Sequence, residues 1–190
     1  VEAMKLGGGK WRWARVHNTR SAGYETNDLG YQRDADQTLW AGNLRYQVTS
    51  PGRVFRSWNL GGNAWTGYTF GGERTSLGGN VNGSFRLLNF WGANGGVGME
   101  RPIVAVRALR GGPSLRIPAS YNAWGGVSSD SRKRVYGSLN VSGGWDAEED
   151  GYGWDVSPSV TWRASSRSDL SLQPSFSRSL NTWQFVGSDA

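Results

Sequence analysis

Apolar and polar residues alternate along the C-terminal half of the chain. From Trp154 to Ala164 the even-numbered residues are all apolar and the odd-numbered ones are all polar. Successive side chains of a β-strand point to opposite faces of a sheet, so this period of two predicts a strand with one apolar and one polar face. The same alternation runs from Arg134 to Trp145 and from Leu170 to Ser177.

The N-terminal half follows the same pattern with more interruptions. A strand is predicted from Trp40 to Val48, then a turn at residues 49–52 and a further strand segment from Val54 to Phe70. The longest alternating run extends from Asn80 to Met99, whereas residues 101–117 give no clear pattern. In total we expect about ten strands and no helix.

One change of parity stands out among these strands. Trp58 and Trp65 differ in parity, so an unbroken strand would place them on opposite faces. Glycine in a strand interior commonly marks a β-bulge, which inserts one extra residue. We therefore predict a bulge at Gly61–Gly62.

Composition supports an all-β chain. Of 190 residues, 29 are Gly and 11 are Trp, and 13% are aromatic. Glycine costs about 1 kcal/mol in a helix, and an aromatic content this high argues against disorder.

The absence of Cys rules out disulfides and thiolate metal sites. A mean hydropathy of −0.55 without a long apolar run rules out a transmembrane helix. We treat residues 1–190 as a single domain.

Two all-β architectures fit these strands, a soluble β-sandwich or jelly roll and an antiparallel transmembrane-type β-barrel or part of one. The predicted strands are long, which favours the barrel, whose strands need about 9–11 residues. Trp154 and Trp162 share a face eight positions apart. At about 3.3 Å per residue and a tilt near 40° they are separated by roughly 20 Å along the membrane normal, close to the spacing of two aromatic girdles. In a sandwich the same tryptophans would fill the core.

The barrel interpretation assigns roles to both faces. Membrane barrels place aromatic residues at the two lipid–water interfaces and polar residues in the lumen. The predicted interface anchors are Trp40, Trp91, Trp145, Trp154 and Trp162. The predicted lumen residues are Arg45, Arg86, Asn140, Asp155 and Arg163.

Three loop and turn segments resemble a known family. They are Gly23 to Asp36, the turn Arg110–Pro113 followed by Pro118, and Ser129 to Arg134. These segments are similar to those of a family of uncharacterised bacterial outer-membrane β-barrels, and the similarity runs over most of the chain. In that family the barrel follows a periplasmic sugar-binding module of the family-nine carbohydrate-binding type.

The resemblance implies a location and a role. The expected location is the outer membrane of a Gram-negative bacterium. The expected role is a passive pore or membrane anchor for a carbohydrate-binding or uptake system, with lipid and a periplasmic sugar-binding module as partners. This chain lacks that module and ends at Gly187–Ala190 without a terminal aromatic strand. We therefore expect an internal part of a larger barrel, which closes alone, pairs with copies of itself or joins the rest of that barrel.

Two polar clusters are candidate binding sites. Asp146, Glu148, Glu149 and Asp150 lie in a predicted turn and could bind Ca²⁺, although their spacing lacks the pattern of a known calcium loop and a solvated loop tip also accounts for them. The long connection before Trp40 is the second cluster, and it is either a binding or plug loop in the lumen or a structural loop. Its charged members are Glu25, Asp28, Arg33, Asp34 and Asp36.

Other functional classes have less support. The formal net charge is +6, but apart from Arg132–Arg134 the basic residues are scattered singly, so we expect no nucleic-acid partner. No hydrolase elbow, P-loop or dinucleotide fingerprint is present, His17 is the only imidazole, and no cofactor is expected. A soluble glycan-binding domain with exposed tryptophans and a hydrolase with a carboxylate- or His17-based site remain the alternatives.

Overall fold

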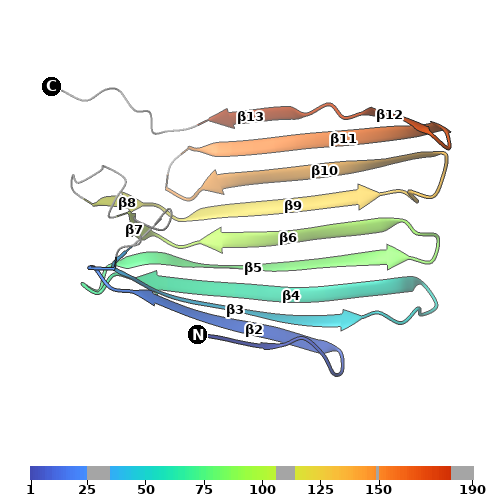
Figure 1. Ribbon diagram of the computed structural model, residues 1–190. Coiled ribbons are helices and arrows are strands. Elements are labelled where there is room, and N and C mark those ends of the chain that lie inside the picture. Colours follow the sequence, from blue (N-terminus) through green and yellow to red (C-terminus); the bar gives the residue numbers. More distant parts are fainter. Residues whose placement is uncertain (25–34, 106–113, 149, 181–190) are drawn as a thin grey trace.

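The computed structural model describes residues 1–24, 35–105, 114–148 and 150–180, and all their regular elements are β-strands. Alternating apolar and polar residues produce long strands, and the intervening polar and Gly-rich segments reverse the chain (Figure 1). The strands are β1 (Glu2–Lys5), β2 (Trp11–Arg20), β3 (Gln37–Val48), β4 (Phe55–Tyr68), β5 (Arg74–Leu87), β6 (Gly92–Glu100), β7 (Ile103–Ala105), β8 (Leu115–Ile117), β9 (Ser120–Ser128), β10 (Val135–Asp146), β11 (Tyr152–Ser165), β12 (Ser168–Leu172) and β13 (Phe176–Leu180).

Eleven of these strands form one antiparallel sheet in the order β1-β2-β3-β4-β5-β6-β9-β10-β11-β12, with β13 also pairing to β11. Each strand from β1 to β6 pairs with its neighbour in sequence, and the same holds from β9 to β12. β7 and β8 form a separate two-stranded sheet beside one end of the large sheet (Figure 1). The predicted all-β antiparallel class is confirmed, and the expectation of about ten strands is close.

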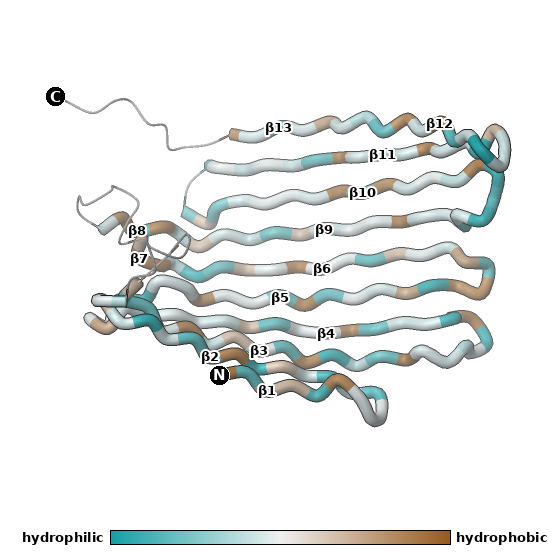
Figure 2. Tube along the Cα trace, viewed as in Figure 1, coloured by the Kyte–Doolittle hydropathy of each residue, from teal (hydrophilic) through white to brown (hydrophobic). Residues whose placement is uncertain are grey.

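The large sheet is open. β1 lies at one edge and β12 and β13 at the other, and the described strands of these two edges do not pair with each other (Figure 2). Ala119 is the one apolar residue that is buried among the residues the structure describes. A closed barrel is therefore not formed by the described strands, and a packed core does not cover their apolar side chains.

The connections differ between the two ends of the sheet. At one end, here called the short-turn end, the chain reverses through residues 6–10, 49–54, 88–91, 129–134 and 166–167. The described residues of the two longest connections, 21–24, 35–36, 101–105 and 114–119, lie at the opposite end, here called the long-connection end. Gly8 and Gly9 have φ of +71° and +73° in the first short turn, a conformation that glycine adopts without a steric penalty.

Two sequence-based expectations need correction. The register of β4 with β3 and β5 is unbroken across Gly61–Gly62, so the predicted bulge is wrong and Trp65 lies on the polar face. The run from Asn80 to Met99 is a hairpin of β5 and β6, not a single extended strand. Its turn places Phe90 at φ +68°, an uncommon conformation for a bulky residue.

The described residues contain no helix that is long and apolar enough to cross a membrane.

Candidate functional site

One face of the large sheet is apolar from β2 to β13. Cross-strand register carries the alternation of each strand onto its neighbour, so Val81 pairs with Val97 and Val141 with Val156. These side chains are not covered, since the exposed fraction of Val81 is 54% and that of Val97 is 61%. The aliphatic members in mid-sheet are Leu44, Leu60, Val81, Val97, Val127, Leu139, Val141 and Val160. Exposed apolar area of this extent is uncommon in soluble monomers.

Aromatic side chains border this apolar face at the short-turn end. The Trp11 and Tyr46 ring centroids lie 5.0 Å apart in an edge-to-face contact, and Tyr46 lies 5.5 Å from Trp58. Phe55 and Phe85 make a further edge-to-face contact at 5.3 Å. Neighbouring strands thus contribute a row of aromatic rings to this margin.

The long-connection end has a second aromatic margin. His17 stacks on Trp40 with ring centroids 4.8 Å apart, and Tyr121 stacks on Trp145 at 5.8 Å. Trp154 lies on the same face near the start of β11, and Trp162 lies near its other end. The aliphatic residues therefore lie between two aromatic margins.

The predicted anchors are distributed accordingly. Trp40, Trp145, Trp154 and Trp162 all lie on the apolar face, and Trp91 is half-exposed in the turn between β5 and β6. Sequence parity alone accounts for the four strand positions.

The opposite face is polar and is crossed by side-chain hydrogen bonds. Asn63 Nδ2 donates to Asn80 Oδ1 at 2.7 Å, and Asn82 Nδ2 donates to the same oxygen at 2.8 Å. The Ser138 and Ser159 hydroxyls lie 2.8 Å apart on β10 and β11. The register places all the predicted lumen residues on this face, namely Arg45, Arg86, Asn140, Asp155 and Arg163.

Two of the tryptophans that the structure describes lie on the polar face and do not contribute to the apolar one. Trp65 Nε1 donates to Glu100 Oε2 at 3.3 Å. The Trp124 ring covers Gly96, where any larger residue would collide with the indole. Both partners are distant in the sequence, so a local pattern does not reveal these contacts.

Basic residues gather at the short-turn end. In the sequence they are scattered, but a meander brings every second turn, with the strand ends beside it, to the same end of the sheet. The basic residues at this end are Lys5, Lys10, Arg12, Arg45, Arg53, Arg56, Arg86, Arg132, Lys133, Arg134, Arg163 and Arg167. The described acidic residues there are Asp130 and Asp169. At the long-connection end, arginines are mixed with Asp36, Glu73, Glu100, Asp146, Glu148 and Asp150.

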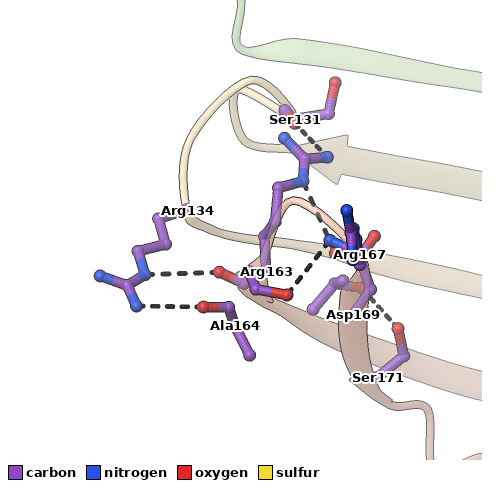
Figure 3. Close-up of polar contacts among 9 residues, drawn as sticks. Ser131, Arg134, Arg163, Ala164, Arg167, Asp169 and Ser171 are labelled. Atoms are coloured by element: carbon purple, nitrogen blue, oxygen red, sulfur yellow. Dashed lines mark hydrogen bonds and ion pairs between the residues drawn. The ribbon is translucent and has the colours of Figure 1, made fainter.

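Some of these basic side chains hold the turns in place. Arg134 in the β9–β10 turn donates to the carbonyl oxygens of Arg163 and Ala164 at 3.3 and 3.2 Å (Figure 3). Arg163 Nε lies 3.6 Å from the Asp169 carboxylate, and Arg163 also donates to the Ser131 carbonyl oxygen at 3.5 Å (Figure 3). The corner formed by β10, β11 and β12 is therefore cross-linked by two arginines.

A second turn cluster is centred on Phe90. The Arg132 guanidinium carbon lies 3.1 Å from the Phe90 ring centroid, and that of Arg56 lies 4.6 Å from it. Arg132 also donates to both carboxylate oxygens of Asp130 at 2.8 Å. These hydrogen bonds lower the pKa of Asp130 to about 2, so the carboxylate is charged at neutral pH.

The predicted loop site and metal site are covered only in part. Glu25, Asp28, Arg33, Asp34 and Glu149 lie outside the described residues. Asp36 is described, and its Oδ1 accepts a hydrogen bond from the Phe70 amide at 2.9 Å.

The turn that carries the predicted metal ligands is linked to β8. Glu148 accepts two hydrogen bonds from Arg116 at 2.6 and 2.8 Å, which lower the Glu148 pKa. Asp146 and Asp150 lie in the same turn region. No group of three or more metal-ligating side chains comes together in the described part of the chain.

His17, the one imidazole, lies on the apolar face. Its ring is nearly parallel to that of Trp40, and its Nε2 lies 2.9 Å from the Thr19 hydroxyl. Both contacts come from the sheet itself and account for the orientation of the ring.

These observations define an antiparallel β-sheet protein with one exposed apolar face, one polar face and one basic end. A family model described as a domain of unknown function (DUF5916) matches residues 2–190. The match covers nearly the whole chain, and the protein belongs to this family. No curated protein and no solved structure matches it.

Proposed function

We propose that the sheet is part of the wall of a β-barrel in the outer membrane of a Gram-negative bacterium. The apolar face contacts lipid and the polar face lines the lumen. The barrel serves as a passive pore or as a membrane anchor for a carbohydrate-binding and uptake system, whose partner is a periplasmic sugar-binding module. The carbohydrate association rests on the sequence resemblance alone.

One observation carries the membrane part of this proposal, the exposed apolar face between two aromatic margins. Mid-sheet residues such as Val97 are exposed, and the rings of Trp11 and Tyr121 lie toward opposite ends. A soluble protein would bury such a face, whereas lipid solvates it and places aromatic residues at both interfaces.

Strand length supports the same proposal. β3 and β10 each have 12 residues, and β4, β5 and β11 each have 14. A tilted strand of about 9–11 residues crosses the hydrocarbon region, so these strands span it with residues left at both ends. The open edges imply that further strands, from the rest of a larger barrel or from another copy, complete the wall, because lipid cannot satisfy unpaired backbone groups.

The test compares two arginine substitutions on β6. Val97 lies on the apolar face, and Asn94 lies on the polar face of the same strand. Each variant is refolded into phosphatidylcholine vesicles. Val97→Arg should lower the free energy of unfolding by about 2–4 kcal/mol, because it places a cation on the lipid face. Asn94→Arg should change the free energy of unfolding by less than about 1 kcal/mol. Urea titration followed by tryptophan fluorescence measures both.

Solubility gives the opposing outcome. If the chain folds as a monomer without detergent, and Val97→Arg is then no less stable than Asn94→Arg, the membrane proposal is wrong. A soluble sheet that displays its tryptophans to glycans would behave in this way.

A further inference from the structure

The polar face contains a hollow at the short-turn end. Its volume is about 490 Å³, and it is lined by strands β3, β4, β5, β6 and β9. The polar lining includes Arg56, Arg86, Asn59, Ser84, Asn94 and Ser128. Among the described residues no acidic side chain lines it, so cationic and neutral polar groups surround the space.

A register shift accounts for the position of Arg56. Phe55 pairs with Leu87 and Ser57 pairs with Arg86, so β4 has one more residue than β5 here, and that residue is Arg56. A β-bulge of this kind redirects the side chain of the extra residue. Phe90, whose backbone has a positive φ in the adjoining turn, places its ring against the guanidinium of Arg56.

Arg56 and Arg86 lack carboxylate partners among the described residues, whereas two other arginines of this end, Arg132 and Arg163, form ion pairs. Arg132 is paired with Asp130 and Arg163 with Asp169, but no ion pair or hydrogen bond involves the Arg86 guanidinium in the described part of the chain. Arg86 lies directly across from Ser57, next to Arg56. Two like charges at neighbouring positions repel each other, and a bound anion would remove that repulsion.

We propose that this hollow binds an oxyanion, meaning a phosphate, sulfate or carboxylate group. Guanidinium groups bind such anions through charge-assisted and often bidentate hydrogen bonds. The Asn59 and Asn94 amides and the Ser84 and Ser128 hydroxyls supply further donors. The inference deepens the proposed function and rests on it in one respect: if the polar face lines a lumen, the hollow lies at its mouth and the favoured solutes are anionic.

The binding test uses the full chain folded in detergent micelles and the fluorescent trisulfonate pyranine as probe. Arg56→Gln with Arg86→Gln should weaken binding by about tenfold or more, because both charge-assisted hydrogen-bond donors of the site are lost. The matched control is Arg116→Gln with Arg178→Gln, which removes the same charge elsewhere and should leave the affinity within about twofold. Fluorescence anisotropy measures each dissociation constant.

Retention of charge separates a binding role from a structural one. Arg56→Lys with Arg86→Lys should recover part of the affinity, since lysine keeps the charge but loses the bidentate geometry. Equal far-UV circular dichroism of the variants checks their folding. If the variant with Arg56→Gln and Arg86→Gln binds pyranine as well as its matched control does, the proposed site is wrong.

Competition identifies the source of the anion. Displacement of pyranine by inorganic phosphate, with no effect of phosphatidylglycerol added to the micelles, assigns the site to free solutes. Displacement by phosphatidylglycerol alone assigns it to lipid headgroups. Either result supports an oxyanion site, and displacement by neither contradicts it.

Conductance separates this inference from the proposed pore. In a planar lipid bilayer with a KCl gradient, the wild-type chain should show an anion-selective reversal potential. The variant with Arg56→Gln and Arg86→Gln should shift that potential toward cation selectivity. Conductance without anion preference, combined with no pyranine binding, overturns the inference and leaves the pore. Pyranine binding without conductance supports the site and contradicts a pore formed by copies of this chain alone.

Discussion

Asp130 and Arg132 form a two-point ion pair within a single turn. Both carboxylate oxygens of Asp130 accept hydrogen bonds from the guanidinium of Arg132, and one of them also accepts from the Arg132 amide at 3.0 Å. The Asp130 side chain is 5% exposed, whereas that of Arg132 is 59% exposed. The acid is therefore enclosed by the turn, and its charge orients the arginine over Phe90.

This pair predicts a pH dependence of stability. The pKa of Asp130 in the folded protein, about 2, lies below the ordinary value near 3.9. The ionised Asp130 therefore stabilises the folded protein above about pH 4. That contribution is lost as the pH falls from about 4 to about 2. Over this pH interval the free energy of unfolding, measured by urea titration, should fall more for the wild type than for Asp130→Asn. Parallel pH profiles of the two proteins would contradict the assignment.

The asparagine cluster on β4 and β5 gives a second prediction. Asn80 Oδ1 accepts from both Asn63 and Asn82, so Asn80→Leu leaves two donors without their acceptor. The substitution should lower the free energy of unfolding by about 1–3 kcal/mol. Asn80→Asp keeps an acceptor oxygen and serves as the control in the same urea titration. Equal stability of the leucine variant and the wild type would show that these bonds contribute little.

A glycine covered by an aromatic ring gives the third prediction. A methyl group at Gly96 would collide with the Trp124 ring and would lie 2.8 Å from the Val81 carbonyl oxygen. Gly96→Ala should therefore cost about 1–3 kcal/mol of stability. At Gly125 the nearest neighbour is the Asn94 carbonyl oxygen at 3.7 Å, so Gly125→Ala should change stability by less than about 1 kcal/mol. Thermal or urea unfolding of the two variants compares them directly, and equal losses would contradict the contact with Trp124.

Sequence periodicity predicted the faces of the sheet better than its turns. Trp154 and Trp162 share a face because side-chain direction in a strand depends on parity alone. Parity also concealed the hairpin between Asn80 and Met99. Phe85 and Ala93 are paired on one face although a turn separates them, and that turn contains neither glycine nor proline.

The alternation of apolar and polar residues did not predict contacts between residues that are distant in the sequence. The predicted bulge would have placed Trp65 on the apolar face with Trp58. Trp65 instead lies on the polar face, where its indole donates a hydrogen bond to Glu100 on another strand. The basic end was missed for a related reason. Arg56 and Arg132 are far apart in sequence and both contact Phe90 because alternate turns of a meander lie at one end. Basic residues recurring at every second predicted turn are the signal that would have revealed it.

The meander also determines how the sheet can form in time. Most strands pair with their immediate successor across a short turn, so hairpins can add one after another with a small loss of chain entropy at each step. Two pairings are exceptions, because residues 21–36 separate β2 from β3 and residues 101–119 separate β6 from β9. We expect the strands before and after the longer of these connections, residues 101–119, to form as two separate units whose joining is the slow step of refolding.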